Sequence, residues 1–180
     1  SPSSAASDVY KRQELGNRIV LLEEPCPKGE LEKMKYVKEH SEIPIFADES
    51  AATYEDAKRV IEKNAADGIN IKLQKAGGIY PGMQIAQLAK ENKLNVMVGC
   101  MLETGISIAA GTHFAASLDN IINTDLDSDF SLVVDILEKK YSVPFSDGCR
   151  IPLDVPGLGV ELDPLLKALM TGDLLLKKIM

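Results

Sequence analysis

The sequence contains no tryptophan and only four phenylalanines, so aromatic side chains can contribute little to its core. Because 45% of its residues are hydrophobic, isoleucine, leucine, valine and alanine are left to fill the interior, a composition that buried parallel strands favour. No apolar run reaches the roughly 18 residues that a membrane-spanning helix needs. The opening residues SPSSAAS also lack the apolar stretch of a secretory signal. We therefore expect a cytoplasmic protein with no membrane partner.

Cysteines and clusters of basic residues are scarce as well. The three cysteines, Cys26, Cys100 and Cys149, are odd in number and lack the spacing of metal ligands, which favours reduced thiols over disulfides. The net charge is −7 and no lysines or arginines gather into a stripe, which argues against binding of nucleic acid.

What the sequence does contain is a regular series of β-branched apolar runs with helix-like segments between them. The steps from one run to the next are 26, 24, 26 and 26 residues, and the runs begin near Arg18, Pro44, Gly68, Leu94 and Asn120. Such even spacing is typical of repeated βα units in a parallel sheet. Five strands do not close a barrel, and 180 residues fall short of the about 250 of a complete β/α barrel. The pattern therefore fits an open α/β sheet or the C-terminal part of a barrel.

Local signals place helices in the gaps between the runs. Thr53 followed by Asp56 is a variant of the capping box, and Pro81 suits the first turn of a helix. Further helices are expected over residues 30–40, 105–117, 130–139 and 163–180. No linker divides the chain, so we expect one domain over residues 14–180. Residues 1–13 have no hydrophobic periodicity and are expected to be non-native or disordered.

Carboxylates end the first two runs. Glu23 ends IVLLE and Asp48 ends IPIFAD. Parallel strands of a barrel deliver their carboxyl ends to one face, where the catalytic groups of such barrels lie. Because neighbouring strands are about 4.8 Å apart, the two carboxylates can share one divalent cation, and Mg²⁺ prefers such oxygen ligands. Glu24 points to the face opposite to Glu23. Taken singly, Glu23 is more often a solvated acid at a strand end, and Asp48 is more often a turn or cap residue.

Lys72 ends the third run, INIK, on the same face as Asn70 and Gln74. Near a cation its pKa tends downward, which suits a base for proton transfer. Lys75 has the other parity or lies in the following loop, and we expect it to be a surface charge.

Three further acids are candidates for binding a substrate. Asp125 and Asp127 share one face of the last run, and paired acids suit a substrate ammonium group, although they are equally typical of a polar loop. Glu103 can face the same site or serve as a structural hydrogen-bonding residue.

Taken together, LLEEP, ADES, NIKLQKAGG, GCMLETG and DLD resemble the enolase superfamily, in particular its muconate-lactonizing subgroup and the dipeptide epimerases of the L-Ala-D/L-Glu type. The resemblance runs from about Ile19 to Gly159. It implies an α/β fold, a partial TIM-like (β/α)7β barrel with about strands 4–8 and the C-terminal tail.

The resemblance also implies roles for the candidate residues. Glu23 and Asp48 would hold Mg²⁺, and Lys72 would be the catalytic lysine of the sixth strand. Asp125 and Asp127 would contact the amino group of a dipeptide substrate. The implied enzyme is an isomerase that abstracts an α-proton and stabilises the resulting enediolate.

The sequence departs from the family pattern in three ways. It has no counterpart of the second-strand Lys-x-Lys, of the first metal-binding aspartate or of the N-terminal capping domain. We therefore expect a truncated product with very low activity by itself. The alternatives are a cycloisomerase or acid-sugar dehydratase of the same superfamily, and a non-catalytic half-barrel that binds a partner through its exposed strand edges. Assembly as a homo-oligomer remains open.

Overall fold

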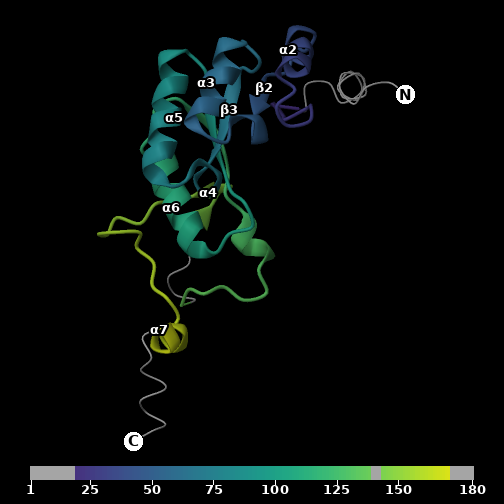
Figure 1. The fold of residues 1–180 in the computed structure, drawn as a ribbon. Coiled ribbons are helices and arrows are strands. Elements are labelled where there is room, and N and C mark those ends of the chain that lie inside the picture. The colour runs from purple at the N-terminus through teal and green to yellow at the C-terminus, as the bar shows by residue number, and fades with distance from the viewer. Residues whose placement is uncertain (1–18, 139–142, 171–180) are drawn as a thin grey trace, which may run out of the picture. The chain divides into compact units, whose positions relative to one another are not determined.

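The computed structural model describes residues 19–138 and 143–170 (Figure 1). Its centre is a parallel sheet of five strands in the order β1-β2-β3-β4-β5. The strands are β1 (Leu22–Glu23), β2 (Ile45–Ala47), β3 (Gly68–Lys72), β4 (Asn95–Gly99) and β5 (Ile121–Asp125). Each predicted run forms its strand, and the sheet is that of a partial TIM-like barrel, as the sequence predicts. Arg18, where the first strand was expected to begin, lies outside the described residues.

Helices occupy the gaps between successive strands. The segment between β1 and β2 contains α2 (Leu31–Glu39), and the next contains a short 3-10 helix, η2 (Glu49–Ala51), followed by α3 (Tyr54–Glu62). Between β3 and β4 come α4 (Leu73–Ala76) and α5 (Ile79–Glu91), with Pro81 in the first turn of α5 as predicted. The chain between β4 and β5 forms α6 (Gly105–Ala116).

The described residues group into two compact units. Those of the first lie within 19–99 and 118–125 and include the whole parallel sheet, and those of the second lie within 100–117, 126–138 and 143–170. The expectation of one domain over residues 14–180 stays a prediction. Residues 1–13 lie outside the described part of the chain.

In the core of the first unit, a small residue makes room for a buried aromatic ring. Phe46 is the largest of its fully buried side chains. The ring lies over Gly68, the residue paired with Phe46 in the neighbouring strand, and a Cβ atom at Gly68 would lie 2.3 Å from it. Ile85 and Ala89 of α5 are four residues apart and both buried, as expected for the inward face of a helix.

The amino end of α3 is closed by the capping box that the sequence predicts. The Asp56 amide donates to Thr53 Oγ1 at 3.2 Å, and the Thr53 amide donates to Asp56 Oδ2 at 3.1 Å. Burial works against the charged form of Asp56, but the hydrogen bonds with Thr53 and the charge of Arg59 outweigh it. The pKa of Asp56 therefore lies below its ordinary value.

In the second unit, the prediction of a helix over residues 130–139 is wrong. A 3-10 helix, η3 (Ser128–Ser131), is followed by a non-helical segment up to residue 138. Asp135 in this segment accepts hydrogen bonds from the backbone amides of Gly105, at 2.8 Å, and Leu137, at 3.2 Å. These contacts and an antiparallel bridge between Leu137 and Leu162 override the helical periodicity.

The C-terminal part of the second unit contains a hairpin that the sequence analysis missed. Strands β6 (Phe145–Ser146) and β7 (Cys149–Arg150) pair in antiparallel fashion. Asp147 and Gly148 between them both have positive φ, and Asp-Gly is a common signal for such a turn. The final described helix, α7 (Pro164–Met170), begins where a helix was predicted, and residues 171–180 lie outside the described chain. None of the helices in the described ranges is long and apolar enough to cross a membrane.

The capping box gives the first prediction. Thr53→Ala should lower the free energy of unfolding in urea by about 1 kcal/mol at neutral pH, because an orphan amide of α3 loses its acceptor. A folded-state pKa below the unfolded value stabilises the protein above the unfolded pKa, about 3.9 for Asp. That contribution is lost as the pH falls through the folded pKa, so the difference between variant and parent should shrink in acid.

Thr104→Ala is the matched control, because Thr104 precedes α6 without a side-chain capping bond. Equal losses in Thr53→Ala and Thr104→Ala would contradict the assignment.

Candidate active site

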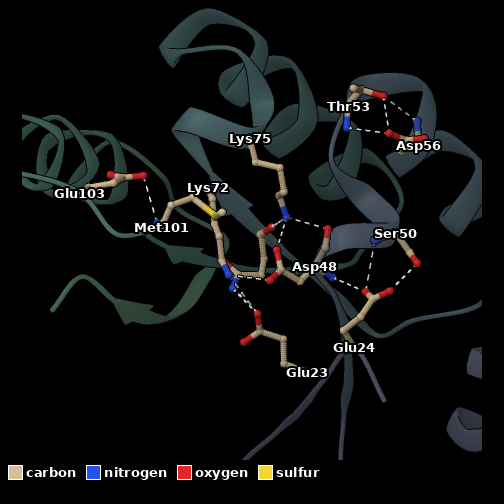
Figure 2. A network of polar contacts seen from close by, with 11 residues as sticks. Glu23, Glu24, Asp48, Ser50, Thr53, Asp56, Lys72, Lys75, Met101 and Glu103 are labelled. Carbon is tan, nitrogen blue, oxygen red and sulfur yellow. Dashed lines mark hydrogen bonds and ion pairs between the residues drawn. The ribbon is translucent and has the colours of Figure 1, made fainter. Parts of the chain in front are cut away.

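The candidate site lies at the carboxyl ends of the first three strands (Figure 2). Glu23 is the last residue of β1, Asp48 directly follows β2, and Lys72 is the last residue of β3. Parallel pairing of β1 with β2 and of β2 with β3 brings these ends to one edge of the sheet.

The Lys72 ammonium group lies between the two carboxylates. Its Nζ atom is 2.6 Å from Asp48 Oδ2 and 3.6 Å from Glu23 Oε1. The side chain of Lys72 is 15% exposed and that of Asp48 only 4%, so water screens this ion pair weakly. The structure thus brings together the three side chains that the sequence pattern singles out.

Asn70 is a member of this site whose role the sequence analysis did not assign. Its Nδ2 atom donates to Glu23 Oε1 at 2.8 Å. The residue is fully buried, and its Oδ1 atom has no hydrogen-bond partner among the described residues. A buried unpartnered oxygen beside a carboxylate is a place where a cation or a proton donor would be stabilised. The signal in the sequence was the face that Asn70 shares with Lys72.

Gly99 makes room for these side chains. It is paired with Lys72 across β3 and β4. A Cβ atom at Gly99 would lie 2.7 Å from Asn70 Oδ1 and 3.0 Å from Lys72 Cε. The site therefore depends on the absence of a side chain at this position.

The expectation that Lys75 is a surface charge is wrong. Its side chain is 12% exposed, and its ammonium group donates to the Asp48 carboxylate. It also donates to the backbone oxygens of Asp48, at 2.6 Å, and Asn70, at 3.0 Å. The short helix α4 begins directly after Lys72 and turns Lys75 back to the strand ends, which strand parity could not reveal.

The two neighbouring glutamates serve different partners. Glu23 faces Lys72, whereas Glu24 has a positive φ of 38° and accepts hydrogen bonds from the loop after β2. Its Oε2 atom accepts from the amides of Asp48, at 2.8 Å, and Ser50, at 3.3 Å, and the Ser50 hydroxyl donates to its Oε1 atom. As the predicted alternation of faces requires, only Glu23 points to Lys72, whereas Glu24 stabilises the loop that carries Asp48.

Burial and pairing set the charges of the site. Burial raises the pKa of Glu23, and the neighbouring Asp48 raises it further. Burial also opposes ionisation of Asp48, but its hydrogen bonds with Glu23 and the two lysines prevail, and its pKa lies below the ordinary value.

The two lysines shift in opposite directions. Burial disfavours the Lys72 ammonium, but the Asp48 carboxylate outweighs burial and the pKa of Lys72 is raised. Lys75 is more deeply buried, so burial prevails and its pKa is lowered despite the same partner. As it stands, the site holds Lys72 as a cation against an anionic Asp48.

The donor atoms fit a hard divalent cation in kind. Two carboxylates and the unpartnered Asn70 oxygen are oxygen ligands of the type that Mg²⁺ takes. The Lys72 ammonium already places positive charge between the two carboxylates. A divalent cation at the same place would neutralise their negative charges in the same way. Within residues 19–138 and 143–170, no three His, Cys, Asp or Glu side chains form a group able to hold a metal ion. Glu23 and Asp48 would thus be two ligands of a site that needs further donors.

The remaining candidates lie at different places. Asp125 ends β5 and is paired with Gly99, which is itself paired with Lys72. Two strand spacings, about 9.6 Å, therefore separate the backbones of Asp125 and Lys72. Asp127 is exposed and precedes η3 in the second unit. Their role in binding an amino group stays a prediction.

Glu103 has structural hydrogen bonds in the second unit. It is 8% exposed, its Oε1 atom accepts from the Met101 amide at 3.1 Å, and its own amide donates to Ser128 Oγ at 3.1 Å. These contacts agree with the structural alternative, and its role in substrate binding stays a prediction.

Comparison with known proteins identifies the family. The model of the family described as "Enolase C-terminal domain-like" matches residues 4–166. This chain belongs to the enolase C-terminal domain-like family. The resemblance to the enolase superfamily inferred from the sequence motifs is thereby confirmed.

Similar members of the enolase family include dipeptide epimerases. The L-Ala-D/L-Glu epimerase of Bacillus subtilis is 37% identical over 92% of this chain and 45% of its own length. Its substrate-liganded structure superposes with a TM-score of 0.80 over 87% of this chain and 43% of that one.

Two further solved structures are similar. The dipeptide epimerase of Enterococcus faecalis, complexed with Mg and L-Leu-L-Tyr, has 38% identity and a TM-score of 0.71 over 74% of this chain and 38% of that one. The muconate cycloisomerase of Pseudomonas fluorescens has 30% identity and a TM-score of 0.83 over 92% and 46%. The chain thus spans less than half the length of these relatives.

The tight contact at Gly99 gives the second prediction. Gly99→Ala should lower the free energy of unfolding by about 1–3 kcal/mol, because the new methyl group forces Asn70 and Lys72 to move. Urea denaturation would measure this loss. Asn95→Ala, at the exposed start of the same strand, is the control and should change stability by less than about 0.5 kcal/mol. A Gly99→Ala variant as stable as this control would contradict the conclusion that the site has no space for a Cβ atom at this position.

Proposed function

We propose that this chain supplies part of the active site of a magnesium-dependent dipeptide epimerase. The observation that carries the proposal is the Lys72 ammonium between the carboxylates of Glu23 and Asp48 at the ends of three parallel strands. The similarity to L-Ala-D/L-Glu epimerases supports this class of reaction. Because these relatives are named epimerases, the proposed enzyme would be an isomerase.

Lys72 is proposed to move the proton on one face of the substrate. The proton leaves the α-carbon for the neutral Nζ atom of Lys72, and the electron pair of the broken C–H bond moves into the adjacent carboxylate group to form an enediolate. Return of a proton to the opposite face inverts the centre and requires a second acid. The resemblance to the enolase superfamily assigns this role to the second-strand Lys-x-Lys, which has no counterpart in this sequence. Mg²⁺ held by Glu23 and Asp48 would supply positive charge against the enediolate and replace Lys72 as their counter-ion.

Asp125 is proposed to select a substrate with a free amino group. It ends β5 on the edge of the sheet that also carries Lys72. Two extended residues span about 7 Å, so a dipeptide whose α-carbon meets Lys72 can direct its amino group toward the end of β5. Asp127 follows two residues later and is proposed to contribute to the same recognition, with Glu103 as a further candidate.

A cycloisomerase is the second candidate function. The structure of the Pseudomonas fluorescens muconate cycloisomerase has a TM-score of 0.83 with this chain. Muconate offers no ammonium group to acids such as Asp125 and Asp127, whereas a dipeptide does. Activity on a dicarboxylate such as muconate, with none on dipeptides, would favour this alternative. Activity on acid sugars, with none on dipeptides, would favour an acid-sugar dehydratase.

The third prediction tests the reaction. Extended to the full length of its relatives, the protein should incorporate deuterium from D₂O at the α-carbon of L-Ala-L-Glu or of another dipeptide in a panel, as measured by NMR. The chain by itself should show very little exchange. Lys72→Met should lower the exchange rate by about 10²–10⁴-fold, the usual contribution of a general base.

Lys63→Met is the matched control, because Lys63 is exposed and pairs only with Glu32 on the surface in the contacts described. An extended protein that folds and binds Mg²⁺ but exchanges no member of the panel would refute the dipeptide substrate.

The fourth prediction concerns Asp125. Asp125→Asn should lower kcat/KM for dipeptides by about 10–100-fold, because a charged hydrogen bond is worth about 1.5–3 kcal/mol. The loss should disappear for N-acetylated dipeptides, which carry no ammonium group. Asp119→Asn is the control, since Asp119 is exposed and pairs with Lys90. Equal losses for free and acetylated dipeptides would show that Asp125 does not recognise the amino group.

A further inference from the structure

Asp48 directly follows the last residue of β2 that pairs with a neighbouring strand. Pairing between β2 and β3 ends with Ala47 and Ile69, so the backbone of Asp48 needs other partners. Asp48 is nevertheless 3% exposed, and hydrogen bonds reach it from both neighbouring strand ends. One set involves Glu24 after β1, and the other involves Lys72 and Lys75 at the end of β3.

Glu24 holds the backbone of the Asp48 loop. Its carboxylate accepts the amide protons of Asp48 and Ser50 and the hydroxyl proton of Ser50, while Ser50 Oγ accepts from the Gly29 amide at 2.7 Å. Glu24 adopts a left-handed φ that non-glycine residues rarely take. Such a conformation persists where the surroundings hold it, and here the hydrogen bonds to the loop do so.

Lys75 holds the same residue from the opposite side and differs from Lys72 in its partners. Two of its three acceptors are the backbone oxygens of Asp48 and Asn70. These remain available when the Asp48 carboxylate binds another cation. The ammonium of Lys72, in contrast, contacts the carboxylates of Asp48 and Glu23, so a cation shared by them would take its place.

We infer that Glu24 and Lys75 are positioning residues that fix Asp48. Glu24 holds the backbone amides of the Asp48 loop, and Lys75 holds both the backbone oxygen and the carboxylate of Asp48. The two lysines on Asp48 then act in opposite senses on cation binding. Lys72 competes with the cation, whereas Lys75 orients the carboxylate that receives it. This inference rests on the proposed function only in taking Asp48 as a metal ligand.

Titration of the chain with Mn²⁺, followed by electron paramagnetic resonance, separates the two roles. Lys72→Met should tighten Mn²⁺ binding, because a competing cation is removed. Lys75→Met should weaken it by about 10–100-fold, the usual effect of losing a residue that orients a ligand, although it too removes a positive charge. Lys63→Met should leave the affinity unchanged. If Lys75→Met fails to fold by circular dichroism, Lys75→Gln, which keeps a hydrogen-bond donor, takes its place.

The direction of the Lys75 effect decides the outcome. Tighter or unchanged Mn²⁺ binding in Lys75→Met would overturn the inference, because Lys75 would then be only a competing or a silent charge. Failure of the parent chain to bind Mn²⁺ at all would count instead against the metal site of the proposed function.

Amide hydrogen exchange tests the positioning role without a metal. Glu24→Ala should speed exchange of the Asp48 and Ser50 amides by about tenfold or more, since both lose their acceptor. Lys75→Met should do the same for the Ala51 amide, which donates to the Asp48 backbone oxygen at 3.0 Å. Glu62→Ala, at an exposed residue of α3, is the control. Unchanged protection of these amides would overturn the inference even if Mn²⁺ does not bind.

Discussion

Two carboxylates held close together at the end of a parallel sheet require positive charge between them, and much of the first unit meets this requirement. Glu23 and Asp48 lie on neighbouring strands, where mutual repulsion would disfavour their ionisation. The Lys72 ammonium compensates them from the third strand, at 2.6 Å from Asp48 and 3.6 Å from Glu23. Because burial weakens the screening by water, the position of each charge matters more here than on the surface. A divalent cation at the same place would meet the same requirement and free the ammonium of Lys72 for the proton transfer proposed above.

The surrounding structure keeps this charged cluster compact. Gly99 leaves space for Asn70 and Lys72, and Gly68 leaves space for the ring of Phe46 in the neighbouring strand. Glu24 closes the loop that carries Asp48. A larger side chain at Gly99 would displace Asn70 and Lys72, and one at Gly68 would displace Phe46. Residues that are not proposed to contact the substrate therefore help to determine the geometry of the site.

Much of this arrangement could be predicted from the sequence, and the errors have identifiable causes. The capping box at Thr53 and the strand ending at Lys72 are local patterns, and both are observed. The expected helix over residues 130–139 is absent because Asp135 accepts backbone hydrogen bonds from Gly105 and Leu137. The first of these contacts joins residues 30 positions apart in the chain, and the second joins residues two positions apart in a non-helical turn. Hydrophobic periodicity carries no information about either. Lys75 was misplaced for a similar reason, since a short helix reverses its direction immediately after the strand.

By itself, the sequence determined the alternation of strands and helices and therefore the common edge at which Glu23, Asp48 and Lys72 meet. Hydrophobic period, caps and even spacing are properties of neighbouring residues, so they can be read without coordinates. Only the tertiary structure decided that Glu24 supports the Asp48 loop, that Lys75 is buried against Asp48 and that Asn70 has an unpartnered oxygen. Those facts depend on which atoms of distant segments come within hydrogen-bonding distance, and that is settled by packing in three dimensions.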